Sequence, residues 1–160
     1  MTNKMGLMAL GLSMALLSGC GSSGGSDDPT APVDVATKIV GTWLGDCHQN
    51  GVNDYSLEQI TFNADGSGMY YGSDYDVAGC DPQNVVESYD TTFDYTIGAT
   101  VAAADGADAV ELNLDAPGTD DWYTMVRFDA DNLLLADGEN SDNPANRAND
   151  FSGVTVFVKQ

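Results

Sequence analysis

The chain has 160 residues, with 25 Asp or Glu against five Lys or Arg and a formal net charge of −20 at pH 7. Surfaces that bind nucleic acid or anionic lipid headgroups use Lys and Arg to neutralise phosphate, so this balance argues against both partners. The length is enough for one domain with its own core in addition to a short leader.

The amino-terminal residues have the layout of a bacterial secretory signal. A lysine precedes an apolar stretch, residues 5–17, which is shorter than the roughly 20 residues of a membrane-spanning helix. It leads into Leu-Ser-Gly-Cys, residues 17–20, which resembles the lipobox of bacterial lipoproteins. That resemblance implies removal of the signal peptide 1–19 and lipidation of Cys20, which would anchor the protein in a membrane. Gly21 stands where sorting rules place Asp for inner-membrane retention. We therefore expect an outer-membrane lipoprotein, with its periplasmic or surface-exposed face left open.

Residues 20–34 follow as a tract rich in Gly, Ser, Asp and Pro. A tract with so few apolar side chains behaves as a flexible coil. The sequence therefore predicts a lipidated linker over 20–34 and a single folded domain over 35–160.

The domain contains two further cysteines, Cys47 and Cys80. In an exported, oxidising compartment an even pair predicts a disulfide. Metal or redox chemistry is the alternative, because His48 adjoins the first cysteine. However, neighbours on a strand point to opposite faces, and the chain has no Cys-x-x-Cys spacing. The acidic stretch 137–143 is a candidate calcium loop, although it lacks the EF-hand pattern. We expect a structural disulfide, no bound metal and no cofactor.

Apolar and polar residues alternate with a period of two along the domain, which indicates strands. Asp-Gly and Pro-Gly pairs between the runs favour tight turns and antiparallel neighbours. The predicted strands cover residues 39–47, 55–63, 68–76, 85–97, 99–104, 109–115, 121–129, 132–136 and 153–159, after a short helix within 30–40. We expect an all-β, antiparallel, up-and-down barrel of about eight strands, with a two-sheet β-sandwich as the alternative.

The first predicted strand carries a motif of known barrels. Gly41 and Trp43 form a Gly-x-Trp sequence that resembles the signature of lipocalins and related calycin barrels. Together with Cys47, the hairpin-like run 60–68 and Cys80, it is similar to the lipocalin-like domains of small bacterial lipoproteins. The resemblance implies a barrel that Trp43 closes at one end.

In lipocalins an arginine from late in the chain packs on this tryptophan, where cation–π attraction contributes about 0.5 to 2 kcal/mol. Arg127 and Arg147 are the candidates. We prefer Arg147 because it lies just before the last predicted strand. The resemblance therefore implies a barrel-closing set of Gly41, Trp43 and Arg147.

The expected function is non-enzymatic binding of a small hydrophobic or amphipathic ligand inside the barrel. The predicted domain over 35–160 has no Gly-x-Ser-x-Gly nucleophile elbow, and with so many acids some carboxylate pairs approach by chance. The alternative is a structural or protein-interaction module of the cell envelope with a filled core. The expected partners are the membrane, through Cys20, and a small ligand; a protein partner remains open.

Overall fold

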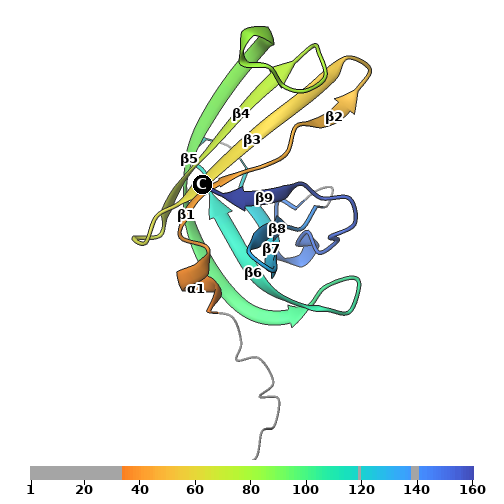
Figure 1. The fold of residues 1–160 in the computed structure, drawn as a ribbon. Helices are drawn as coiled ribbons and strands as arrows, with labels where there is room; N and C mark the ends of the chain where they lie inside the picture. The colour runs from red at the N-terminus through yellow and green to blue at the C-terminus, as the bar shows by residue number, and fades with distance from the viewer. Residues whose placement is uncertain (1–33, 119, 138–140) are drawn as a thin grey trace, which may run out of the picture. The chain divides into compact units, whose positions relative to one another are not determined.

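The structure, a computed structural model, describes residues 34–118, 120–137 and 141–160 (Figure 1). Its elements are α1 (Val35–Lys38), β1 (Gly41–Leu44), β2 (His48–Gly51), β3 (Asp54–Phe62), β4 (Ser67–Tyr75), the 3-10 helix η1 (Pro82–Asn84), β5 (Val85–Ala102), β6 (Asp108–Asp115), β7 (Trp122–Asp129), β8 (Asn132–Leu135), the 3-10 helix η2 (Pro144–Asn146) and β9 (Val156–Lys159). The described chain is therefore all-β, apart from a few short helical turns.

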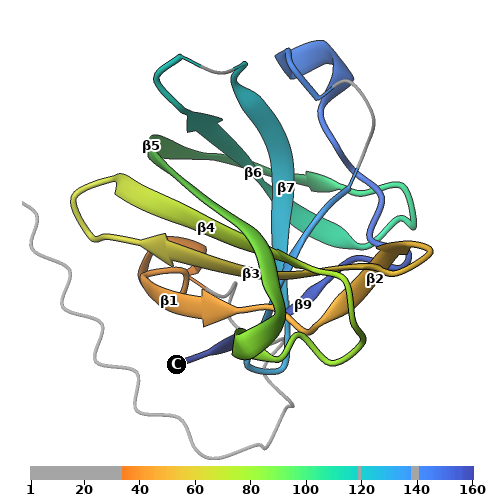
Figure 2. The same ribbon diagram turned by 90° about the horizontal axis from the view of Figure 1, so that it is seen from above.

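The strands form one antiparallel sheet that closes into a barrel (Figures 1 and 2). From β3 to β9 each strand pairs with the next, and β1 pairs with both β9 and β3. Trp43 accordingly lies opposite Ile60 on one side and Lys159 on the other. β2 pairs with the first half of β3 as an extra strand. The predicted eight-stranded antiparallel barrel is confirmed, and the β-sandwich alternative is wrong.

One face of each strand lines the interior, because side chains alternate along a strand. The innermost of them include Ile60, Phe93, Leu112, Val126 and Leu133, none more than 4% exposed. They come from five different strands and belong to one cluster. Burial of such side chains stabilises a fold by about 1.5 to 3 kcal/mol each, so this cluster is the main source of stability.

Helix α1 covers one end of the barrel. The Asp34 side chain caps it by accepting hydrogen bonds from the backbone N–H and the hydroxyl of Thr37, the latter at 2.6 Å. Val35 in the helix and Ile39 directly after it are 9% and 0% exposed, and both pack in the same cluster as Trp43. The helix is therefore a lid on this end, and β2 lies toward the opposite end (Figure 1).

The long connection between β8 and β9 covers part of the outer wall. Its Ala148 and Phe151 pack with Met125 of β7 and Ala109 of β6 in a second apolar cluster. The Ala148 N–H also donates to the Tyr123 carbonyl at 2.9 Å. The domain therefore has a main core inside the barrel and a smaller one outside it.

The strand boundaries differ from the prediction in three places. The expected strand 39–47 is shortened to β1, Gly41–Leu44, with Cys47 beyond its end in the disulfide, and β2 lies outside every predicted strand. The runs 85–97 and 99–104 form one strand, β5, whose pairing with β6 absorbs the interruption as a register shift. The last strand begins at Val156 rather than at residue 153.

Candidate functional site: the barrel cavity

The barrel is hollow at the end away from α1. A cavity of about 540 Å³ opens there, within the range of roughly 300 to 1,000 Å³ that is typical of small-molecule sites. Its lining consists of His48, Asn50, Glu58, Ile60, Tyr70, Thr91, Phe93, Leu114, Ala116, Asp120, Trp122, Leu135, Ala136, Asp137, Gly153, Val154, Thr155 and Phe157. The barrel interior thus combines the packed side chains of the main cluster with an open cavity at this end.

The deep part of the cavity is apolar and aromatic. Ile60 of β3 and Phe93 of β5, 1% and 4% exposed, form this apolar floor, and Leu114 and Trp122 lie on the same inward face at the adjoining ends of β6 and β7. The Phe93 ring lies directly over Gly68 of β4, where a methyl group would overlap it. This glycine lets the ring lie flat against β4, and a larger residue there would displace the ring.

A carboxylate projects inward above this apolar floor. Glu58 of β3 accepts a hydrogen bond from the hydroxyl of Tyr70 of β4 at 2.6 Å. The Tyr70 ring stacks on Tyr89 of β5 with 6.1 Å between centroids, and Gly72 leaves the space that the Tyr89 ring occupies. Burial, and then the bond to the carboxylate, raise the pKa of Tyr70. Tyr70 therefore stays protonated and keeps donating to Glu58.

One disulfide and one chain of hydrogen bonds hold the rim of the cavity. Cys47, between β1 and β2, is joined to Cys80, in the β4–β5 connection, with their Cα atoms 5.8 Å apart. The Asn50 amide donates to the Ser56 hydroxyl, which donates to Asp74 at 2.8 Å, so that β2, β3 and β4 are linked side by side. The predicted disulfide is confirmed, and it fixes the loops that border the opening.

The closed end is built around Trp43, which is 1% exposed and donates its indole N–H to the Ile39 carbonyl at 2.6 Å. The cation over its ring is Lys159 of β9, with Nζ 5.1 Å from the centroid. A side chain at Gly41 would collide with that lysine. Gly41 and Trp43 lie in β1 at this end of the barrel, and the expected placement of Arg147 on this tryptophan is wrong. The final strand supplies the cation instead.

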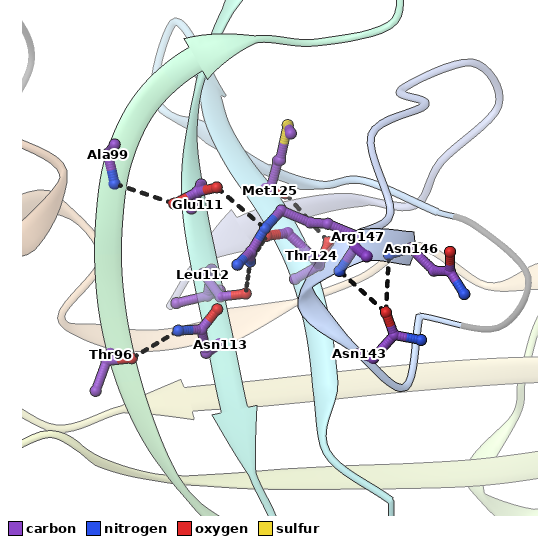
Figure 3. Close-up of polar contacts among 11 residues, drawn as sticks. Thr96, Ala99, Glu111, Leu112, Asn113, Thr124, Met125, Asn143, Asn146 and Arg147 are labelled. Carbon is purple, nitrogen blue, oxygen red and sulfur yellow. Dashed lines mark hydrogen bonds and ion pairs between the residues drawn. The ribbon is translucent and has the colours of Figure 1, made fainter.

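Arg147 lies on the outer wall of the barrel (Figure 3). Its Nη1 donates to the carbonyls of Leu112 and Thr124 at 3.0 and 2.9 Å, and its Nε lies 3.4 Å from Glu111. The guanidinium also sits 5.6 Å from the centre of the Tyr123 ring. These contacts fasten the β8–β9 connection to β6 and β7, and they leave the arginine side chain only 10% exposed. Arg147 therefore does not close the barrel.

The remaining predicted sites are the lipidated cysteine, the calcium candidate and His48. Cys20 lies outside the described residues, as does part of the calcium candidate 137–143. Within the described ranges no cluster of three or more His, Cys, Asp or Glu could hold a metal, and no helix is long and apolar enough to cross a membrane. His48 lines the cavity with Nδ1 3.3 Å from the Asp46 carbonyl oxygen.

Comparison of the chain with protein-family models, curated proteins and solved structures finds no match. The closed eight-stranded antiparallel barrel is itself consistent with a lipocalin-like architecture. Fold alone does not assign an activity, so the functional argument rests on the cavity.

Proposed function

We propose that the protein is a non-enzymatic outer-membrane lipoprotein whose barrel binds a small hydrophobic or amphipathic molecule. The lipobox-like sequence ending at Cys20 supports the anchor, because two or more acyl chains hold a protein stably on a membrane. The Gly/Ser-rich residues after it provide a tether for the barrel domain.

The observation that supports ligand binding is the open cavity with an apolar floor and polar groups above it. Ligand sites are typically concave, largely apolar, and carry a few polar groups that orient the ligand. Ile60 and Phe93 supply the first character, and Glu58 and Tyr70 supply the second. A cavity of about 540 Å³ that served only the fold would forgo the packing that stabilises a core.

Native mass spectrometry of the protein purified from its own host tests this proposal. Thr91 lines the cavity, whereas Thr92 points to the opposite face of β5 and is exposed. A small molecule should be retained by the wild type and by Thr92→Trp, and lost from Thr91→Trp with the barrel still folded. Retention by none of the three proteins, or equally by all, would contradict ligand binding in the cavity.

The anchor is tested by membrane fractionation and by globomycin, which blocks processing of lipoprotein signal peptides. The wild-type chain and a linker control, Ser22→Ala, should be found in the membrane fraction. Cys20→Ala should lose membrane association. A wild-type protein that is soluble and insensitive to globomycin would refute lipidation.

A further inference from the structure

The charge inside the cavity is of one sign. Glu58, Asp120 and Asp137 are among the residues that line it, together with one histidine, His48. None of the described lining residues is a lysine or an arginine. An anionic ligand headgroup would therefore meet carboxylates, whereas a cationic one would find them as counter-ions.

The described cations are all engaged elsewhere. Lys38 lies against Asp131 and over the Phe128 ring, and Lys159 lies over Trp43, both at the closed end. The two arginines bind acids on the outer wall. In the part of the chain that the structure describes, no lysine or arginine is placed to neutralise Glu58 from within the barrel.

Aromatic rings line the same cavity as this carboxylate. Tyr70 donates its hydroxyl to Glu58, and the rings of Phe93 and Trp122 line the same cavity. Ring faces attract ammonium groups, and more strongly where water is excluded. A carboxylate beside Tyr70, in a cavity that other aromatic rings and an apolar floor line, matches a molecule with an alkyl or aryl body and one positive charge.

We propose that the cavity selects cationic amphiphiles, meaning molecules that join an apolar body to an amine or quaternary ammonium group. This inference rests on the proposed ligand-binding function. The apolar body occupies the floor beside Ile60 and Phe93, and the cationic group pairs with Glu58. Asp120, an exposed acid of the lining, adds the same sign of potential along the entry.

The test compares three probes of equal chain length, namely decyltrimethylammonium and decanoate below their micelle concentrations and decanol below its solubility limit. Calorimetry on the full chain carrying Cys20→Ala, which removes the lipid anchor, gives the dissociation constants. Trp122 lines the cavity and provides a fluorescence signal for the same titrations. We expect the cation to bind at least about tenfold more tightly than decanoate, which corresponds to 1.4 kcal/mol.

Two charge variants locate the effect. Glu58→Gln should weaken decyltrimethylammonium about tenfold and leave decanol unchanged. Asp90→Asn removes the same single charge from the exposed outer face of β5 and should change neither. Equal weakening by both variants would mean that the overall charge, and not Glu58, selects the cation.

The outcomes separate the two proposals. If decanol and decanoate bind but the cation binds no better than decanoate, cation selectivity is refuted while ligand binding stands. If no probe binds, and the host protein also retains no molecule, both proposals fail. Thr91→Trp should abolish binding of every probe, because it fills the shared cavity.

Discussion

Replacement of Arg147 by methionine tests how the outer wall is held together. The substitution keeps an unbranched apolar stem but removes the guanidinium, which bonds the carbonyls of Leu112 and Thr124 and pairs with Glu111 (Figure 3). Since only 10% of the arginine side chain is exposed, water has limited access to the groups that it leaves behind. We therefore expect a clear loss of stability.

The magnitude follows from these contacts. A hydrogen bond from a charged donor contributes about 1.5 to 3 kcal/mol, and two share the same nitrogen here, so their sum lies below twice that value. The ion pair with Glu111, whose side chain is 32% exposed, adds at most about 1 kcal/mol. The free energy of unfolding should fall by about 2 to 4 kcal/mol, which lowers the melting temperature by roughly 10 °C in a domain of this size.

Denaturant and thermal unfolding of the wild type, Arg147→Met and Arg147→Lys provide the assay. Lysine carries the charge but not the planar fork of donors, so it should recover only part of the loss. In a Trp122→Phe background, which leaves Trp43 as the one tryptophan, fluorescence of the folded state should stay unchanged in Arg147→Met and shift in Lys159→Met, because the lysine is the cation over that ring. A wild-type melting temperature in Arg147→Met, or the opposite fluorescence pattern, would refute this reasoning.

Three further predictions concern other links in the fold. Loss of the disulfide in Cys47→Ala/Cys80→Ala should lower the free energy of unfolding by about 3 to 4 kcal/mol, from the entropy of a loop of 33 residues, as urea melts will measure. Gly68→Ala should cost about 1 to 3 kcal/mol in the same assay, because its methyl group overlaps the Phe93 ring. The arginine bound to Asp105 holds the pKa of that carboxyl below its ordinary value, so the bond stabilises the fold above the unfolded pKa of about 3.9. The stability gap between wild type and Asp105→Asn should therefore be constant at neutral pH and shrink in acid melts as pH falls through the depressed native pKa; a gap independent of pH would contradict it.

The barrel was predictable because its signals are local. Alternation with a period of two separates the inward from the outward residues of a strand, and Asp-Gly turns join consecutive strands. Closure of the barrel has a weaker local signal, because it depends on the pairing of β1 with β9, which lies at the far end of the chain. The disulfide followed from counting cysteines once Cys20 was assigned to lipid.

The cation at the closed end could not be predicted in the same way. Arg147 directly precedes the last strand, but the sequence does not show that its connection runs over the outer wall. A signal for Lys159 was present, because it shares the phase of the buried Phe157 and therefore faces inward. The place of Glu58 in the cavity could not be predicted either. Alternation puts its side chain on the same face as Ile60, but it does not show that the barrel interior beside it is open.

The scarcity of cations gives the acidic composition a more specific meaning than a solvated surface. Each described Lys or Arg joins two segments that are distant in sequence: Lys38 and Lys159 at the closed end, Arg127 and Arg147 under the β8–β9 connection. At those places a positive charge supports the fold. The cavity contains carboxylates and none of these cations, so apart from His48 a bound molecule is the remaining source of positive charge near Glu58. The distribution of the few basic residues, more than the number of acids, is what favours a cationic ligand.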